Sequence, residues 1–197
     1  NFVYDFLYPN PASVLAFIEN HDTDRFLGEG NNLPMLKQAS TLLLTTRRIP
    51  QLYYGTEVMM NGVKSKSDGY VRKDFPGGWT GDATNALTPA GRTKIQNECY
   101  DFYKTILNWR KGNDVIAKGS MVQFMVQNGV YAYARQYEGK TVFVMLNGTD
   151  AETTVPLKFY KEILKNSKQG KDILSGKAIT FGEELKMGPR ESLVIEL

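Results

Sequence analysis

The sequence predicts an α/β region followed by an all-β region within a chain of 197 residues. Three patterns predict this order. Apolar runs flank a helical pattern between residues 14 and 54, a second helical pattern covers residues 88–111, and after residue 118 apolar side chains recur at every second position. A strand, a helix and a strand in succession favour a parallel sheet, whereas period-two runs separated by turns favour antiparallel strands. We therefore predict two domains, residues 1–118 and residues 119–197.

The first predicted unit is a crossover of strand, helix and strand. Residues 14–18 form a continuous apolar run, which is typical of a strand buried on both faces. A helix is expected over residues 33–46, because Asn32 and Pro34 are start signals and apolar residues follow at helical spacing. The second strand is expected over residues 49–54, directly after the helix. Together these elements predict neighbouring parallel strands.

A long polar segment and the clearest helix of the chain follow. Residues 61–87 are rich in Gly, Ser, Asp and Asn, which is typical of a binding loop in a compact domain. The helix is expected to begin with Thr88 as its cap and Pro89 in its first turn, and to end at Gly112. Its predicted buried stripe consists of Ile95, Cys99, Phe102, Ile106 and Trp109. The single cysteine is therefore expected to be a buried thiol without a chemical role, and it excludes an internal disulfide.

The remainder of the chain is predicted to form a small antiparallel sandwich. Asn128-Gly129 and Glu138-Gly139 separate alternating runs, and Asn-Gly is a strong signal for a two-residue hairpin turn. Residues 157–170 fit either a short helix or an irregular excursion. The expected strands carry Val122, Phe124 and Val126, then Tyr131 and Tyr133, then Val142, Val144 and Leu146, with weaker patterns at residues 177–181 and 192–197.

Composition and charge argue against two classes of partner. The 24 basic and 21 acidic residues are scattered along the chain and give a net charge of +3 without a basic stripe, so nucleic acid is not a predicted partner. No apolar run approaches the roughly 20 residues that span a bilayer, so no membrane partner is predicted either. The chain begins with Asn1 and not with methionine, which suggests a processed or excised piece of a longer protein.

His21-Asp22 is the strongest candidate for chemistry. The pair directly follows a predicted buried strand, where parallel sheets carry their functional groups, and His21 is the only histidine. From spacing alone, a hydrogen-bonded loop pair is the alternative. A metal site made of His21, Asp22 and Asp24 is a further alternative, weakened by the lack of a second histidine or a second ligand cluster. Asp24 and Arg25 are expected to form an ion pair that shapes the loop.

Three segments resemble the alpha-amylase superfamily of retaining glycoside hydrolases, in the same order and at similar distances. Phe17, His21 and Asp22 match the motif that ends the seventh barrel strand of that family. Residues 48–57 resemble the eighth strand and its exit, and residues 68–79 resemble the following loop in the neopullulanase and cyclomaltodextrinase branch. The resemblance implies the last two strand-helix units of a (β/α)8 barrel followed by an antiparallel β-sandwich.

The resemblance also implies roles for individual residues. Asp22 corresponds to the third catalytic carboxylate of the family, which holds hydroxyls of the sugar ring being cleaved and does not bond to its reactive carbon. His21 is implied to donate to the same ring, and Asn20 is expected to orient the pair. Asp68 and Arg72 resemble the residues that bind the next sugars. From spacing alone, a solvated salt bridge between Asp68 and Arg72 is an equal alternative.

Aromatic residues supply two further hypotheses. Trp79 is a candidate stacking platform for a pyranose ring, and it is equally a candidate for a hydrophobic plug that anchors the loop. Tyr131, Tyr133 and Tyr137 share one face of a predicted strand. They support an alternative function in which the sandwich is a non-catalytic carbohydrate-binding module.

The family resemblance implies the C-terminal part of an enzyme that acts on starch-derived maltooligosaccharides. In that family the nucleophile and the acid lie on earlier strands, which would precede Asn1, so the 197 residues alone are expected to be inactive. The expected partners are an alpha-glucan oligosaccharide and either the rest of the barrel or a second copy, because an open sheet edge invites pairing. No cofactor and no metal are expected, and a starch-degrading parent favours a periplasmic or extracellular location over the cytoplasm.

Overall fold

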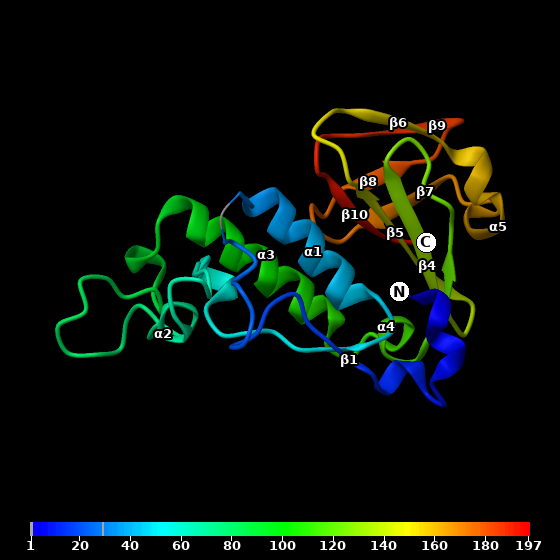
Figure 1. Ribbon diagram of the computed structural model, residues 1–197. Coiled ribbons are helices and arrows are strands. Elements are labelled where there is room, and N and C mark those ends of the chain that lie inside the picture. Colours follow the sequence, from blue (N-terminus) through cyan, green and yellow to red (C-terminus); the bar gives the residue numbers. More distant parts are fainter. Residues whose placement is uncertain (1, 29) are drawn as a thin grey trace.

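The computed structural model describes residues 2–28 and 30–197, so Asn1 and Glu29 lie outside the described part. Two long helices lie between a loop-rich region and a sheet-rich region (Figure 1). The α-helices are α1 (Leu33–Thr45), α2 (Asp68–Val71), α3 (Lys94–Arg110), α4 (Asp114–Lys118) and α5 (Lys161–Leu164). The strands are β1 (Leu15–Ala16), β2 (Ile49–Pro50), β3 (Ser120–Gln123), β4 (Val130–Tyr137), β5 (Lys140–Asn147), β6 (Thr153–Pro156), β7 (Gln169–Asp172), β8 (Ala178–Thr180), β9 (Glu184–Met187) and β10 (Ser192–Glu196).

Short 3₁₀ turns connect these elements. They are η1 (Phe2–Leu7), η2 (Pro11–Ser13), η3 (Thr56–Val58), η4 (Pro89–Gly91) and η5 (Leu157–Tyr160). Within the described residues, no helix combines the length and the apolar character that crossing a membrane requires.

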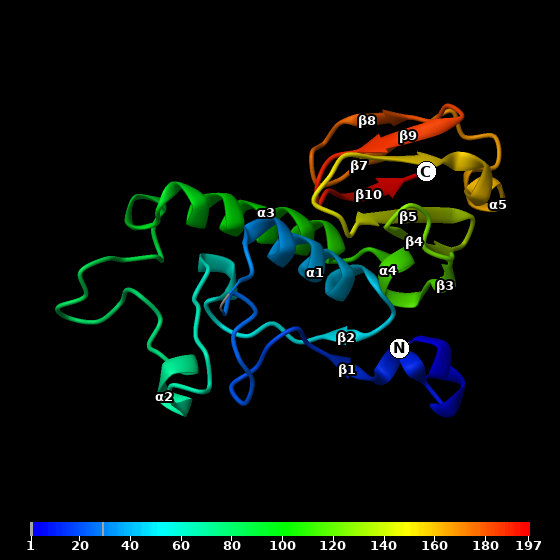
Figure 2. The same cartoon turned by 45° about the horizontal axis from the view of Figure 1, so that its top comes forward.

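The predicted crossover of strand, helix and strand is present. β1 and β2 pair in parallel, with Leu15 opposite Ile49, and they lie side by side beneath α1 (Figure 2). Asn32 caps α1 as predicted, because its side chain accepts a hydrogen bond from the amide of Met35. Both strands are shorter than the predicted residues 14–18 and 49–54. The last hydrogen bond between the two strands runs from the amide of Gln51 to the carbonyl oxygen of Ala16. Beyond it the two segments separate into loops.

α3 begins later than predicted. Thr88 and Pro89 start the short turn η4, whereas the helix starts at Lys94. The reason is a capping box, in which Thr93 and Gln96 satisfy each other's backbone amides. Cys99, Phe102 and Ile106 of the predicted stripe are buried against α1, and Trp109 is partly buried, but Ile95 is 49% exposed because it lies in the first turn of the helix. Gly112 has a positive φ of 79°, as expected of the residue that ends the helix.

The thiol of Cys99 is expected to resist alkylation in the folded protein. Cys99 is fully buried, its Sγ lies 3.6 Å from the carbonyl oxygen of Thr56, and burial raises the pKa of the thiol to about 12. At pH 8 only about one thiol in ten thousand is then a thiolate, the reactive form. Iodoacetamide labelling followed by mass spectrometry should therefore show no adduct in native buffer and full labelling in guanidinium. Stoichiometric labelling of the native chain would contradict this.

The second half of the chain is the expected antiparallel sandwich. In the described residues, one sheet has the order β3-β4-β5-β10-β7-β8, and a pair formed by β6 and β9 covers one of its faces. Both predicted hairpin turns, Asn128-Gly129 and Glu138-Gly139, have positive φ angles at both residues, as tight hairpin turns require. The core between the sheets is apolar, and its members include Val130, Ala132, Phe143, Met145, Val155, Tyr160, Met187, Leu193 and Ile195.

Several strand predictions need correction. β3 ends at Gln123, so the predicted continuation through Phe124 and Val126 is wrong, and Met125 is 84% exposed. β6, β7 and β9 were not predicted, because each has only four residues and lysine or glycine interrupts the apolar alternation of β7 and β9. Residues 157–170 form a turn and a short helix, η5 and α5, before β7 begins. The weak patterns near the C-terminus correspond to β8 and β10.

The other face of the large sheet packs against the helices. Tyr133 is fully buried there, and its hydroxyl forms a hydrogen bond with Thr45 of α1. Arg135, also buried, donates to the carbonyl oxygens of Thr45, Ile116 and Gly119 at 2.8–2.9 Å. The tyrosine face therefore joins the sandwich to α1 and α4. This overturns the hypothesis of a carbohydrate-binding face made of Tyr131, Tyr133 and Tyr137, since Tyr133 has no surface left for a ligand.

Candidate functional site

Polar side chains from two separate loops meet beyond the end of β1. Arg72, at the end of α2, is at the centre of this group. Its Nη2 lies 3.0 Å from Oδ1 of Asp22 and 3.5 Å from Oδ2 of Asp68, and its Nε donates to the carbonyl oxygen of His21 at 3.0 Å. Nε2 of His21 lies 3.1 Å from Oδ2 of Asp22. We call the residues gathered here the loop cluster: Asn20, His21, Asp22, Lys64, Asp68 and Arg72.

Asn20 shapes the turn that presents His21 and Asp22. Its Oδ1 accepts a hydrogen bond from the amide of Asp22 at 2.8 Å, and its own amide donates to Oγ1 of Thr23 at 3.1 Å. A side chain that bonds to the backbone two residues later is a common way to stabilise a turn. The contact acts on the backbone of Asp22, and the role of Asn20 in orienting the two side chains stays a prediction.

Lys64 is a member of the loop cluster that the sequence did not indicate. Its Nζ donates to the carbonyl oxygen of Asp22 at 3.0 Å and lies 3.7 Å from Oδ1 of Asp68, while its amide donates to Oδ1 of Asp24. The only sequence signal was the four-residue spacing of Lys64, Asp68 and Arg72. Lys64 thus ties the loop that carries Asp22 to the loop that carries Asp68.

A buried ion pair lies beneath the loop cluster. Glu19 and Arg25 are 2% and 1% exposed, and Oε1 of Glu19 lies 3.3 Å from Nη1 of Arg25. The guanidinium also donates to the carbonyl oxygens of Tyr54, at 2.6 Å, and Val71, at 3.1 Å, and it lies over the ring of Tyr53. Arg25 therefore connects the segment after β1, the segment after β2 and the end of α2, which carry or flank the site.

The predicted ion pair between Asp24 and Arg25 is wrong. Arg25 turns inward to Glu19, while Asp24 is exposed and accepts the amide of Lys64. The physical reason is that a buried guanidinium needs an equally buried carboxylate, and only Glu19 at the end of the predicted strand is placed to supply it.

The side chains of the loop cluster remain accessible. His21 and Asp22 are 57% and 58% exposed, and Asp68 and Arg72 are similarly open. Two carboxylates and two cations, those of Lys64 and Arg72, balance each other in charge. Such a cluster offers both acceptors and donors to a neutral ligand with paired hydroxyl groups. In the described part of the chain, no three His, Cys, Asp or Glu side chains lie close enough together to hold a metal ion.

The structure does not bring Trp79 into the loop cluster. Its backbone amide donates to Oδ2 of Asp82 within the long loop, and the side chain is 68% exposed. A plug that anchors the loop would be buried, so this alternative is wrong. The exposed ring remains free to act as a platform for a ligand that extends beyond the loop cluster.

The family model described as cyclo-malto-dextrinase C-terminal domain matches residues 121–196. Over residues 121–196 the chain is therefore similar to that domain family. The match covers β4 to β10 and most of β3, which supports the all-β part of the predicted fold.

Curated relatives extend the likeness to most of the chain. An alpha-amylase of Niallia circulans is 31% identical over 89% of this chain, which is 30% of the relative. A cyclomaltodextrin glucanotransferase of Thermoanaerobacterium thermosulfurigenes is also 31% identical over 89% of this chain, which is 22% of the relative. The chain thus spans less than a third of the length of either relative. The predicted resemblance to the C-terminal part of an alpha-amylase superfamily enzyme is confirmed.

Solved structures show the same fold. The alpha-amylase of Geobacillus thermoleovorans, in a complex with acarbose, matches 96% of this chain and 40% of its own, with a TM-score of 0.73 and 23% identity. CldA, a cyclomaltodextrin glucanotransferase with a three-domain ABC distribution, matches 96% of this chain and 37% of its own, with a TM-score of 0.71 and 25% identity.

Proposed function

We propose that this chain supplies sugar-holding residues to a retaining alpha-glucan hydrolase of the neopullulanase or cyclomaltodextrinase kind. The observation that carries the proposal is the convergence of His21, Asp22, Asp68 and Arg72 from two loops into one accessible cluster. The curated relatives named alpha-amylase and cyclomaltodextrin glucanotransferase support the choice of reaction. Starch-derived maltooligosaccharides are the proposed substrates.

The proposed role of Asp22 is to stabilise the transition state. Hydrolysis with retention of configuration at the sugar carbon needs two carboxyl groups about 5 Å apart. One is the nucleophile, the other acts first as acid and then as base, and the transition state resembles an oxocarbenium ion. In this proposal both come from outside the 197 residues. Asp22 accepts two ring hydroxyls, and these hydrogen bonds strengthen as positive charge grows on the sugar, which lowers the barrier to bond cleavage. His21 donates to the same ring, while Asp68, Arg72 and Trp79 contact the sugars that follow.

We further propose that residues 1–118 complete a (β/α)8 barrel and that residues 119–197 form its C-terminal sandwich domain. β1 and β2 are paired in parallel, as neighbouring strands of such a barrel are, and this supports the proposal. In a closed barrel each strand also has a neighbour on its other side. Leu15, Phe17 and Ile49 on or beside these strands are 44–52% exposed. Such side chains are normally covered by other elements when they belong to a parallel sheet. The remaining strands of a barrel are the partner that would cover them.

Two measurements on the 197-residue chain test this function. A reducing-sugar assay with starch and pullulan should show no turnover, because the nucleophile and the acid are not part of the chain. Acarbose, titrated into the ¹⁵N-labelled chain, should shift the amide signals of Asn20, His21, Asp22, Asp68 and Arg72. Turnover that is lost on Asp22→Ala would overturn the inactive-fragment proposal. If acarbose shifts other amide signals to saturation but leaves these five unchanged, the assignment of the site would be overturned.

A further inference from the structure

The chain contains three Asn-Gly pairs, at Asn61-Gly62, Asn128-Gly129 and Asn147-Gly148. In such a pair the backbone amide nitrogen of glycine can attack the side-chain carbonyl of asparagine, because no Cβ on the glycine hinders the approach. The attack releases ammonia and slowly turns asparagine into aspartate, which is one reason why asparagine counts among the thermolabile residues. The three pairs are alike in sequence, so only their surroundings in the fold can distinguish them.

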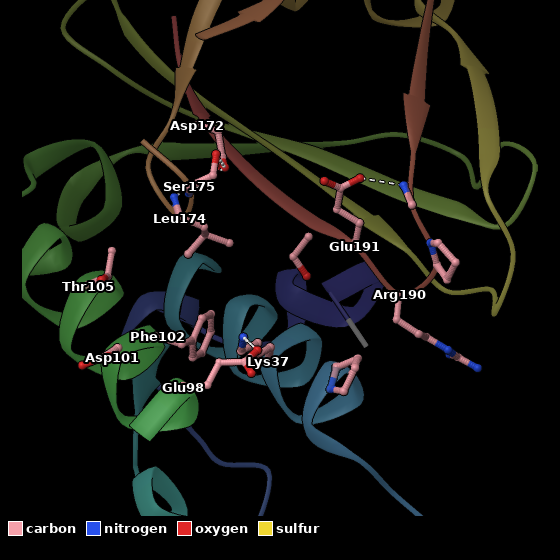
Figure 3. A pocket seen from close by; sticks show the side chains of 14 residues that line it. Lys37, Glu98, Asp101, Phe102, Thr105, Asp172, Leu174, Ser175, Arg190 and Glu191 are labelled. Carbon is pink, nitrogen blue, oxygen red and sulfur yellow. Dashed lines mark hydrogen bonds and ion pairs between the residues drawn. The ribbon is translucent and has the colours of Figure 1, made fainter. Parts of the chain in front are cut away.

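Asn147 is held in place within the sandwich. It is fully buried, and its Nδ2 donates to the carbonyl oxygens of Ala151 and Gly188, both at 2.8 Å. Its Oδ1 accepts the amide and the hydroxyl of Thr149, at 3.0 and 2.8 Å. Glu191 fixes the loop of Gly188 by accepting its amide at 2.6 Å (Figure 3). The side chain of Asn147 cannot turn toward the next amide without breaking several buried hydrogen bonds, so this pair is protected.

Asn128 is exposed but still restrained. It lies in the turn before β4, where both residues of the pair have positive φ angles, of 50° and 78°. Two backbone hydrogen bonds between Gln127 and Val130, at 3.0 and 2.8 Å, close this turn. Nδ2 of Asn128 donates to the carbonyl oxygen of Thr154 at 2.9 Å. Attack on this side chain would have to break its hydrogen bond and distort the closed turn, so the fold slows the reaction here too.

Asn61 lies on the irregular segment between η3 and α2 and lacks such restraints. Its side chain is exposed and has no hydrogen-bond partner within the described residues. Only its backbone carbonyl oxygen is bonded, to Nζ of Lys73 at 3.2 Å. The amide of Gly62 likewise donates to no acceptor in the described part of the chain. Both reacting groups are therefore available, and the side chain of Asn61 can rotate toward the amide of Gly62 without losing a hydrogen bond.

We propose that Asn61 is the site at which this chain spontaneously deamidates. The amide nitrogen of Gly62, once it has lost its proton to solvent base, attacks Cγ of Asn61. A C–N bond forms, the bond between Cγ and Nδ2 breaks, and ammonia leaves, which gives a five-membered succinimide. Water then opens one of the two ring bonds to nitrogen and gives either aspartate or isoaspartate. One water is consumed and one ammonia is released, and because the attack is intramolecular it needs no enzyme.

The modification would reach the loop cluster through Gly62 and Lys64. The carbonyl oxygen of Gly62 accepts the amide of Arg25 at 2.9 Å. A Cβ at Gly62 would lie only 2.6 Å from the carbonyl oxygen of Tyr70, so the backbone fits tightly there. Isoaspartate adds one methylene to the main chain directly before Gly62 and so displaces it. Lys64, two residues later, bonds to the carbonyl oxygen of Asp22, and isoaspartate should loosen this contact.

Peptide mapping by mass spectrometry tests the proposed site on the 197-residue chain itself. The folded chain and the chain unfolded in guanidinium are kept in mildly alkaline buffer and sampled over time. In guanidinium the three pairs should deamidate at similar rates. In the folded chain Asn61 should stay within about threefold of its unfolded rate, whereas Asn128 and Asn147 should slow by about tenfold or more, because their hydrogen bonds must first open.

Two results would overturn the proposed site. One is equal protection of Asn61 and Asn147 by folding, and the other is faster deamidation of Asn128 than of Asn61 in the folded chain. Asn61→Gln is the matched control, since glutamine keeps the amide but would have to form a larger ring. The variant changes an exposed side chain without partners, so it should fold, and a dispersed spectrum verifies this. Its mass should not rise at position 61.

The ¹⁵N-labelled chain tests the effect on the loop cluster. The amide signals of Arg25 and Lys64 should change with the same time course as the mass of the Asn61 peptide, and they should stay constant in Asn61→Gln. If the mass rises while both signals stay unchanged, the effect on the loop cluster is overturned and the site stands. If the signals also change in Asn61→Gln, a different process, such as isomerisation at Asp68-Gly69 without a change of mass, causes the loosening. None of these measurements uses a sugar, so they decide this inference whether or not the proposed function holds.

Discussion

Asparagine in place of Asp22 is expected to reduce kcat by about 100- to 1000-fold in an active enzyme that contains these residues, a loss typical of removing one preorganised electrostatic group. KM is expected to change by no more than about twofold, because the lost interaction is strongest in the transition state. The substitution keeps the shape of the side chain, removes its charge and replaces one acceptor oxygen with an amide donor. Steady-state kinetics with maltoheptaose measures both constants.

Asp74→Asn is the matched control for this prediction. Asp74 is exposed on the loop that follows α2, so the same change of charge is made close to the loop cluster but outside it. Its kinetic constants should stay near those of the unmodified enzyme. If Asp22→Asn raised KM and left kcat unchanged, Asp22 would bind the ground state of the substrate and the proposed transition-state role would be wrong.

Methionine in place of Arg25 is expected to destabilise the fold by about 3–5 kcal/mol, because it leaves the buried carboxylate of Glu19 without its charged partner. For a chain of this size, that loss corresponds to a fall in the melting temperature of roughly 10 °C. The change also removes hydrogen bonds to the carbonyl oxygens of Tyr54 and Val71, which belong to the segments around the loop cluster. Circular dichroism during thermal unfolding measures the effect.

A matched substitution and a double variant make this second prediction specific. Arg190→Met removes an arginine whose partner, Asp150, is 80% exposed, so the melting temperature should change little. Combining Glu19→Gln with Arg25→Met should recover part of the loss, since no unpaired charge is then buried. Equal destabilisation by Arg25→Met and Arg190→Met would show that the buried pair has no special importance.

Local patterns in the sequence were sufficient for much of the architecture. The parallel pairing of β1 and β2 was predictable because a helix between two apolar runs leaves few other arrangements. The hairpin turns at Asn128-Gly129 and Glu138-Gly139 were predictable because glycine, and asparagine in the first turn, tolerate positive φ. The position of His21 and Asp22 after the first strand was likewise visible, and so were the segments that resemble the family.

Contacts between distant segments were decided only by the tertiary structure. Lys64 contacts the carbonyl of Asp22 across 42 residues, and Arg25 bonds to the carbonyl of Val71 across 46 residues. The choice of Glu19 over Asp24 as the partner of Arg25 depends on which carboxylate is buried with it. Burial of the tyrosine face likewise depended on the packing of the sheet against α1 and α4.

The order and type of the main elements and the family likeness of this chain were therefore predictable from residue patterns alone. The order and type of the elements follow from side-chain periodicity and turn chemistry, which act over a few residues. The family likeness came from the motif of Phe17, His21 and Asp22 and from two later segments that resemble the family. The membership of the loop cluster, the inward turn of Arg25 and the burial of Asn147 were decided by the tertiary structure. Each of them requires segments far apart in the sequence to meet, and the energy of burying a charge or an apolar face depends on what the other segment supplies.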